Sequence, residues 1–481
     1  MTRNTWISLA LCAWLGACTS MAPSYERGAT PVPSAWPSGD AYAKTTANTV
    51  TTAKTQTAAE LPWRAFILDP NLQKVVETAL QNSRDLRKTI ATIESARAQY
   101  RVQRAAQLPT VDAGVSGSRA RSLNASSGSD NSTSTSQSYS ASVSLSSYEI
   151  DLFGRVRSLS NAALETYLAT EEAARATRVS LIAETASAWL ALAADRSQRE
   201  IAQRTMDSAE RSMALTRKRL EAGVASRVDV RQAESVYQQA RADVASTTTA
   251  IAQDRNALEL LAGAPIDDAL LPTALPADAS WLAEVPVGLS SNVLLQRPDV
   301  LQAEHQLKSA NANIGAARAA LFPSLSLTAS GGLASAALSS LFSGGATVWS
   351  LAPSLSLPIF DGGASRANVA YSEAQRSLYL SSYELAIQTA FKEVADALAR
   401  RGTMQEQLAA QTALVEASTD SYQLATARYS KGVDTYLVAL DSQRTLYAAE
   451  QTLVSTRQLA LDNSVTLYRT LGGGVCEGKS G

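Results

Sequence analysis

The chain has 481 residues, with 43 basic and 44 acidic side chains, and its formal net charge is −1 at neutral pH. This balance produces no strong field for a polyanion, so we expect no nucleic-acid partner. One histidine and three cysteines leave too few ligands for a metal centre or a disulfide framework, and we expect no metal and no cofactor beyond a covalent lipid.

The first 17 residues are typical of a secretory signal peptide, because Arg3 precedes an apolar run at 6–15 that is too short to span a bilayer. The run ends in L-G-A-C, which resembles the cleavage box of bacterial lipoproteins and makes Cys18 the expected lipidation site. An ordinary signal with a chance cysteine is the alternative. Thr19 stands where an aspartate would favour retention in the inner membrane, so this sorting pattern indicates the outer membrane. Residues 18–60 are rich in Pro, Ser, Thr and Ala and predict an acylated, extended leader.

The rest of the chain repeats one order of elements, which predicts an internal duplication. The first copy is expected to contain a helix over 72–107, strands within 110–118 and 138–145, and helices over 155–221 and 227–262. The second is expected to contain a helix over 299–321, strands within 323–330 and 349–359, and helices over 364–430 and 434–471. The predicted domains are a first repeat at 61–263, a joining segment at 264–296, a second repeat at 297–474 and a polar tail at 475–481.

The strand segments alternate between apolar residues and serine. In the segment 138–145 one face carries Tyr139, Ala141, Val143 and Leu145, and the other carries only serine. Lipid outside and a wet lumen inside predict this pattern, and a soluble sandwich is the alternative. Four strands cannot enclose a wide pore, and lipid does not tolerate an open sheet edge. Several chains are therefore expected to share one barrel, and three would give twelve strands. Ser/Gly-rich loops are expected at 123–137 and 331–345.

The two longest predicted helices are each about 100 Å long at 1.5 Å per residue. The second carries apolar residues at alternating spacings of three and four from Tyr383 to Tyr429, which is a coiled-coil pattern. A second line that includes Phe391 lies beside it, so this helix is expected to pack on neighbours at both sides, as in a ring of helices. Arg401 and Gln411 interrupt the pattern and are compatible with a lumen or a groove edge.

Several of these motifs together resemble the outer-membrane efflux duct family (TolC-like), in its NodT-type lipoprotein branch. They are the lipoprotein box, the duplicated halves, the F-G and F-D-G-G corners at 153–154 and 360–363, and R-Y-x-x-G-V-D-x-Y-L-x-x-L-D-x-Q-R at 428–444. The resemblance implies a mainly α protein with a small β part. In this duplicated TolC-like fold, a homotrimer forms a twelve-stranded outer-membrane β-barrel, four strands per chain, continuous with a long periplasmic α-helical barrel.

The resemblance places a periplasmic gate at Leu437, Asp441 and Arg444, which share one helix face at spacings of four and three. Leu437 would form an apolar ring, Asp441 a ring of negative charge, and Arg444 charge-assisted bonds to carboxylates. The plainer interpretation is an exposed ion pair between Asp441 and Arg444. The upstream copy has Val228, Gln232 and Ser235 at these positions, so the gate is expected to be asymmetric between the two copies.

The resemblance also implies that an adaptor docks at the tips of the two helical hairpins. The expected tip residues are Arg219, Gly223, Val224 and Ala225 in the first copy, and Arg428, Gly432 and Val433 in the second. Both glycines are expected to adopt the left-handed conformation that ends a helix, and simple helix termination is the alternative interpretation.

The expected function is a non-enzymatic exit duct in the outer membrane, lipid-anchored and with a large periplasmic extension. It would passively conduct drugs or other small toxic solutes, with a periplasmic adaptor and an inner-membrane pump of the RND type as partners. The alternatives are the exit duct of a protein secretion system and a lipid-anchored coiled-coil scaffold without a pore. Low methionine and histidine contents disfavour a copper or silver route. His305 is expected to be packed or solvated, and Cys476 to be an unpaired thiol.

Overall fold

The computed structural model describes residues 20–42, 60–124, 132–277, 280–286, 290–343 and 346–474. The chain forms two compact units, each built from three segments. The first contains Met1–Ala29, Thr92–Thr170 and Ala303–Tyr383, and the second contains Thr30–Ala91, Glu171–Gln302 and Glu384–Gly481. The predicted signal peptide, Cys18 and the tail with Cys476 lie outside the described residues. The repeat boundaries divide the chain in another way and stay a prediction.

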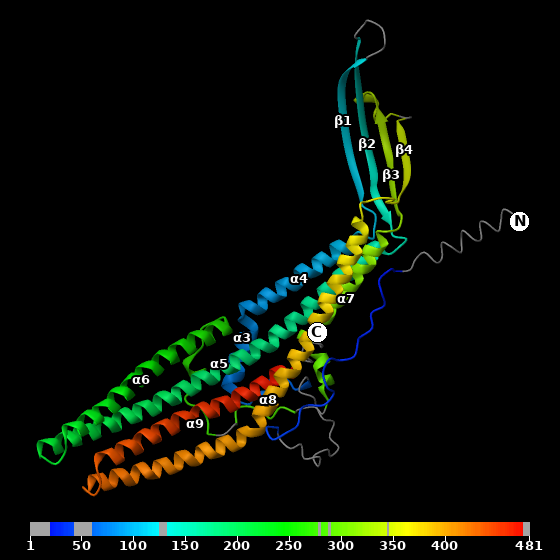
Figure 1. Cartoon of the computed structure of the whole chain (residues 1–481). Helices are drawn as coiled ribbons and strands as arrows, with labels where there is room; N and C mark the ends of the chain where they lie inside the picture. The colour runs from blue at the N-terminus through cyan, green and yellow to red at the C-terminus, as the bar shows by residue number, and fades with distance from the viewer. Residues whose placement is uncertain are drawn as a thin grey trace. The chain divides into compact units, whose positions relative to one another are not determined.

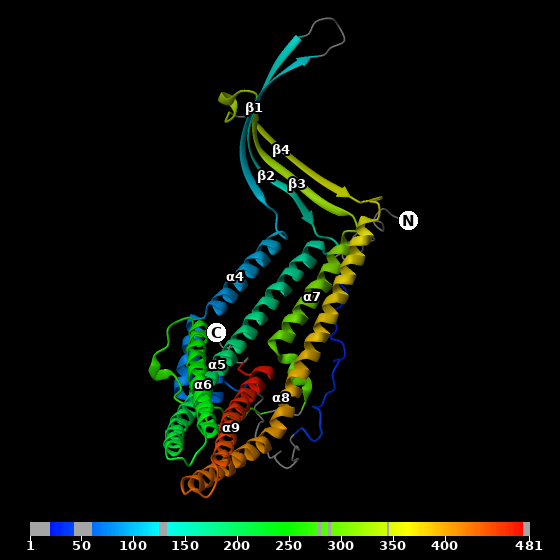
Figure 2. The same cartoon turned by 60° about the vertical axis from the view of Figure 1, so that its left-hand side comes forward.

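The first unit contains an antiparallel sheet whose four strands follow chain order (Figures 1 and 2). The strands are β1 (Val111–Asn124), β2 (Ser132–Ile150), β3 (Ser324–Ser335) and β4 (Thr347–Ser356). All four predicted strands are present, but the loop expected at 123–137 is wrong. The serine- and threonine-rich stretch at 132–137 pairs with 119–124, and Arg121 donates hydrogen bonds of 2.9 and 3.2 Å to the Thr133 hydroxyl. In the second loop a 3₁₀ turn, η5 (Leu338–Ser340), follows β3.

The strand register gives the sheet one apolar and one serine-rich face. One row across the sheet is Val111, Leu145, Ala329 and Leu351, and the next is Ala113, Val143, Gly331 and Trp349. The opposite face carries the row Asp112, Ser144, Ser330 and Ser350. Trp349 is 79% exposed and Leu351 is 59% exposed in this single chain. The predicted alternation is therefore present, and its apolar face has no cover within the described residues.

Ion pairs and a ring contact fix the corner where β2 meets α5 (Arg155–Glu221). Arg155 donates to both carboxylate oxygens of Glu149, at 2.8 and 2.5 Å. Asp151 accepts from the Arg157 backbone N–H at 2.8 Å and so caps the helix. Phe153 stacks on Phe322 with ring centroids 4.8 Å apart. The two acidic residues thus position the start of the helix.

The long helices begin and end close to the predicted residues. They are α5, α6 (Arg227–Ala262), α7 (Pro298–Ala319), α8 (Ala364–Ser430) and α9 (Tyr436–Thr470). Most of the predicted seam on α8 is buried, including Ile387 and Val394. Across the described residues, no helix combines the length and the hydrophobicity needed to cross a membrane.

The single helix predicted over 72–107 is wrong. The structure has α2 (Trp63–Phe66), α3 (Pro70–Asn82) and α4 (Arg84–Ala105). Ser83 separates the last two, with an extended ψ of 130°, and its hydroxyl accepts from the Leu86 N–H at 3.5 Å. The backbone of Asn82 packs closely on Gly263, where a Cβ would lie 2.5 Å from the Asn82 carbonyl oxygen. The helix break between α3 and α4 therefore lies at a contact between two segments that are far apart in the sequence.

Aromatic pairs and a buried arginine hold the core of the second unit. Phe66 stacks on Tyr468 with ring centroids 4.2 Å apart. Trp189 meets Trp281 edge to face at 4.5 Å. The Arg297 side chain, 9% exposed, pairs with Asp299 at 2.7 Å and Glu393 at 2.9 Å. It also donates to the Thr470 carbonyl at 2.7 Å, so one side chain connects α7, α8 and the end of α9. Two 3₁₀ turns, η3 (Asp268–Leu270) and η4 (Ser291–Gln296), lie between the helical segments.

The leader is extended in its described part and is docked on both units by specific contacts. In the first unit, the Tyr25 hydroxyl donates to the buried carboxylate of Glu304 at 3.0 Å. The Arg27 guanidinium donates to both oxygens of the same carboxylate, at 3.1 and 2.5 Å. A Cβ at Gly315 would lie 2.6 Å from the Ala22 backbone nitrogen. In the second unit, Trp36 stacks on Phe391 at 5.4 Å, so the leader covers part of the second line on α8.

A pair of acidic side chains in the second unit predicts a pH-dependent stability. Burial and the neighbouring Asp195 raise the pKa of Asp254 to about 6. Because this folded-state pKa exceeds the unfolded value, stability should rise as pH falls from 7 towards 4. Asp254→Asn should stabilise the protein by roughly 1–2 kcal/mol at pH 8, after reduction for solvent screening, and flatten that dependence. Urea unfolding between pH 5 and 8 measures both effects, with the exposed Glu210→Gln as control. Equal pH dependence in Asp254→Asn and the parent chain would contradict the assignment.

Candidate functional site

The two hairpin tips have the same backbone geometry. Gly223 and Gly432 both have a φ of 77°, in the left-handed region. In the first tip the Val224 N–H donates to the Arg219 carbonyl at 2.9 Å, and in the second the Val433 N–H donates to the Arg428 carbonyl at 3.0 Å. A glycine followed by such a bond is the Schellman ending of a helix. The predicted left-handed glycines are therefore present, and the matching tips support a duplicated origin.

The tips expose apolar side chains, while their arginines already have partners in the chain. Val224 is 74% exposed and Val433 is 62% exposed. Arg219 lies over the Tyr429 ring, 4.3 Å from its centroid, and donates to the Ser430 carbonyl at 3.0 Å. It therefore connects the two tips. Arg428 binds the Asp434 carboxylate, with one bond of 3.1 Å. This hydrogen bond holds the pKa of Asp434 below its usual range. Ala225 is half-buried.

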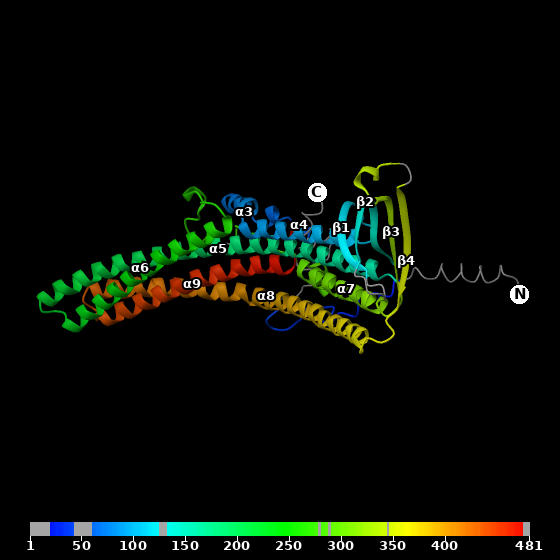
Figure 3. The same ribbon diagram turned by 90° about the horizontal axis from the view of Figure 1, so that it is seen from above.

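Behind the tips, the α5–α6 and α8–α9 hairpins pack side by side in the second unit (Figure 3). A small apolar cluster joins them, consisting of Ala209, Ala233, Val236, Ala425, Tyr429, Tyr436, Ala439 and Leu440. Hydroxyl groups add to this contact. Ser208 lies 2.9 Å from the Tyr422 hydroxyl, and Thr216 lies 3.3 Å from the Tyr429 hydroxyl. The interface between the hairpins is thus partly polar.

The three predicted gate residues lie on α9, and all are exposed in this chain. Leu437 is 56% exposed, and the other two are also exposed. The guanidinium of Arg444 donates to the Ser235 hydroxyl at 3.3 Å. Ser235 is the residue that aligns with Arg444 in the upstream copy. The plainer expectation, an ion pair between Asp441 and Arg444, is wrong, because within the described part of the chain neither forms a salt bridge.

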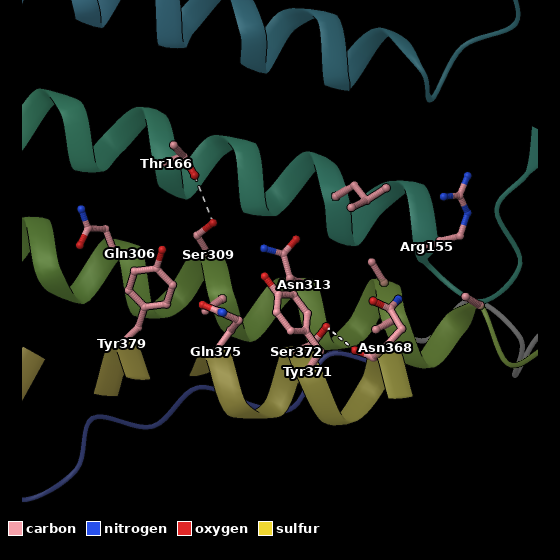
Figure 4. Close-up of a pocket in the computed structure, with 15 residues that line it drawn as sticks. Arg155, Thr166, Gln306, Ser309, Asn313, Asn368, Tyr371, Ser372, Gln375 and Tyr379 are labelled. Atoms are coloured by element: carbon pink, nitrogen blue, oxygen red, sulfur yellow. Dashed lines mark hydrogen bonds between the residues drawn. The ribbon is translucent and has the colours of Figure 1, made fainter. Parts of the chain in front are cut away.

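A polar cavity of about 580 Å³ in the first unit lies between α5, α7 and α8 (Figure 4). Thr166 and Ser309 make a 3.1 Å hydrogen bond at its wall. Its labelled lining is otherwise rich in amides and tyrosines, among them Gln306, Asn313 and Tyr379. No local sequence pattern predicts this cavity, because its polar residues come from three separate helices. Nearby, His305 pairs with Glu165 at 2.6 Å, so it is packed as expected. The described residues contain no group of side chains suited to bind a metal.

Comparison with known proteins assigns the chain to a protein family. The family described as outer membrane efflux protein matches residues 75–264 and 289–473. The chain belongs to the outer membrane efflux protein family. Among its relatives, the probable efflux pump outer membrane protein TtgC of Pseudomonas putida is 47% identical over 478 residues, which cover 99% of this chain and 97% of TtgC.

Solved structures of similar proteins agree with this family. A membrane protein from Pseudomonas aeruginosa is 41% identical, with a TM-score of 0.85 and coverage of 94% of this chain and 100% of that protein. The MtrE outer membrane channel of Neisseria gonorrhoeae, solved in its open state, is 37% identical, with a TM-score of 0.83 and coverage of 95% and 99%. The outer membrane efflux protein family is a family of channels. The predicted resemblance, the mainly helical fold with four strands and the outer-membrane location are therefore confirmed.

Proposed function

We propose that this outer membrane efflux protein is the exit duct of a tripartite pump and passively conducts drugs or other small toxic solutes. The observation that carries the proposal is the two-faced sheet, which has an exposed apolar face and outer strands β1 and β4 paired on one side only. Such a sheet is stable in lipid only if other strands close its edges. A duct needs a wet path, a closed resting state and a docking surface, and no catalytic group or cofactor.

Three copies would close the barrel with twelve strands. The serine-rich face would then line the lumen, where the Ser330–Ser350 and Ser116–Ser140 contacts of 2.8 Å already satisfy hydroxyl groups in pairs. The L-G-A-C sequence supports acylation of Cys18 and a lipid anchor in the outer membrane. Because several acyl chains together anchor stably, the anchor would hold the leader at the membrane.

The hairpin tips would dock a periplasmic adaptor, which connects the duct to an inner-membrane pump of the RND type. The exposed Val224 and Val433 support this role, because apolar side chains at a turn are suited to a protein contact. Arg219 and Arg428 already bind groups of their own chain. They would therefore shape the tips rather than provide free charges to the adaptor.

Recording conductance tests the duct and the gate together. The purified trimer should form channels in planar bilayers. Asp441→Asn combined with Arg444→Gln should increase the open fraction about tenfold, because a charge-assisted hydrogen bond contributes about 1.5–3 kcal/mol. The exposed Asp420→Asn on α8 is the matched control. Unchanged conductance in the double variant would contradict the proposed gate. A monomer that stays soluble without its acyl chains and forms no channels would instead favour a coiled-coil scaffold without a pore, and it would contradict the proposed duct.

A further inference from the structure

A second cavity, of about 400 Å³, lies between α5, α6 and α9 in the second unit. Two of its lining residues are polar and buried, Gln443 at 5% and Thr205 at 9% exposure. Within the described part of the chain, neither the Gln443 amide nor the Thr205 hydroxyl has a hydrogen-bond partner. Their polar atoms are not among the fully inaccessible side-chain atoms that lack a partner, so both remain open to the cavity and can bind a ligand there by hydrogen bonds.

The cavity also has one cationic side chain that lacks an anionic partner. Arg444 lines it and donates only to the neutral Ser235 hydroxyl, at 3.3 Å. A guanidinium has five N–H donors in a fork that fits a carboxylate. Arg444, Gln443 and Thr205 thus offer donors from α9 and α5 to the same space.

The neighbouring carboxylate limits the charge of a ligand. The Asp243 carboxylate accepts hydrogen bonds from Tyr447 at 2.7 Å and Gln239 at 3.0 Å, two residues that line the cavity. Its negative charge faces that of any bound anion, so a dianion is disfavoured against the single guanidinium. The volume far exceeds the 30 Å³ that one water occupies in the liquid. Val236 and the Tyr447 ring supply an apolar wall.

We propose that this cavity binds a small organic monocarboxylate. The carboxylate would accept hydrogen bonds from Arg444, Gln443 and Thr205, and the apolar body would lie against Val236 and the ring of Tyr447. Such a ligand would connect α5, α6 and α9 directly beside the predicted gate. The proposal concerns binding and does not depend on transport, so it stands or falls separately from the proposed duct.

Equilibrium dialysis of benzoate with the mature protein in detergent tests the proposal, at ionic strength held constant with chloride. We expect saturable binding of one benzoate per chain. Benzamide, which has the same shape without the charge, should bind about tenfold more weakly or worse, because it cannot form charge-assisted bonds. Absence of saturable benzoate binding, or equal binding of the two compounds, would overturn the proposal and leave a water-filled cavity.

Two variants assign the binding to this cavity. Arg444→Gln should weaken benzoate binding about tenfold, and the isosteric Thr205→Val about threefold, because each removes a donor. Thr185→Val is the matched control, since it removes another buried threonine hydroxyl of α5 that has no partner in the structure. The control should bind as the parent chain does. Equal affinity in all three variants would place the bound benzoate elsewhere and refute the assignment.

Discussion

Leu351→Arg is expected to prevent assembly in the outer membrane, whereas Ser350→Arg is expected to be tolerated. The two residues are adjacent on β4 and lie on opposite faces of the sheet, in the rows of Ala329 and Ser330 respectively. On the lipid face, an arginine near the bilayer midplane costs about 2–4 kcal/mol, and the proposed trimer would contain three copies of it. On the serine face, the same arginine would point into a wet lumen.

Outer-membrane fractions analysed for a heat-sensitive trimer measure this difference. The parent chain and Ser350→Arg should both give the trimer, and Leu351→Arg should give little of it. The pair controls for local effects, because both variants add the same side chain to the same strand. Assembly of Leu351→Arg at the parent level would show that the apolar face does not meet lipid, and the proposed barrel would then be wrong.

Arg297→Met is expected to destabilise the second unit by about 3–5 kcal/mol, because it leaves buried acceptors without their partner. The Arg297 guanidinium binds three groups at the same time, the carboxylates of Asp299 and Glu393 and the carbonyl of Thr470. Arg297→Lys should recover only part of this loss, because an ammonium cannot reproduce the planar fork of a guanidinium.

Urea unfolding in detergent, followed by tryptophan fluorescence, measures the change. Lys392→Met is a suitable control, because Lys392 forms an exposed pair with Asp396 on α8, and such pairs contribute about 0–1 kcal/mol. If Arg297→Met unfolded at the same urea concentration as this control, the buried cluster would not stabilise the unit.

The long helices follow closely from the sequence because local residues encode their ends. Gly223 and Gly432 end α5 and α8 by adopting a left-handed conformation that needs no distant contact. The break at Ser83 differs, because the close packing of Asn82 on Gly263 joins residues far apart in the chain. No periodicity between 72 and 107 marks that contact, so a single helix is the natural interpretation.

The local sequence predicts the structural role of polar residues less well than that of apolar residues. Ser and Thr at 132–137 suggest a loop in isolation, but pairing with β1 makes them strand. Arg401 and Gln411 suggest a wet edge of α8. In the structure, Arg401 binds the Val285 carbonyl at 3.1 Å, and Gln411 binds the Ala449 carbonyl at 3.3 Å. The role of a half-buried polar side chain depends on its partner, and the local sequence pattern does not indicate that partner.

The same limit applies to the candidate site. The motif at 428–444 indicates the tips and the proposed gate, because its glycine and charged residues have a recognisable spacing. It does not indicate that Arg444 meets Ser235 across the hairpins. Gln443 and Thr205 attract no notice in the sequence, since a lone glutamine or threonine in a long helix is ordinary. Their significance depends on the cavity that they line, which only the packing of three helices creates.

The docked leader has a consequence for engineering this protein. The carboxylate of Glu304 is almost inaccessible to solvent, and Tyr25 and Arg27 of the leader bind it together with Lys308 of α7. A version that lacks residues 20–27 would lose both of these donors and leave Lys308, 3.5 Å away, as the remaining ionic partner of Glu304. A version that lacks residues 20–36 would also lose the stack of Trp36 on Phe391. The described part of the leader is therefore a packed part of the fold and not a free linker.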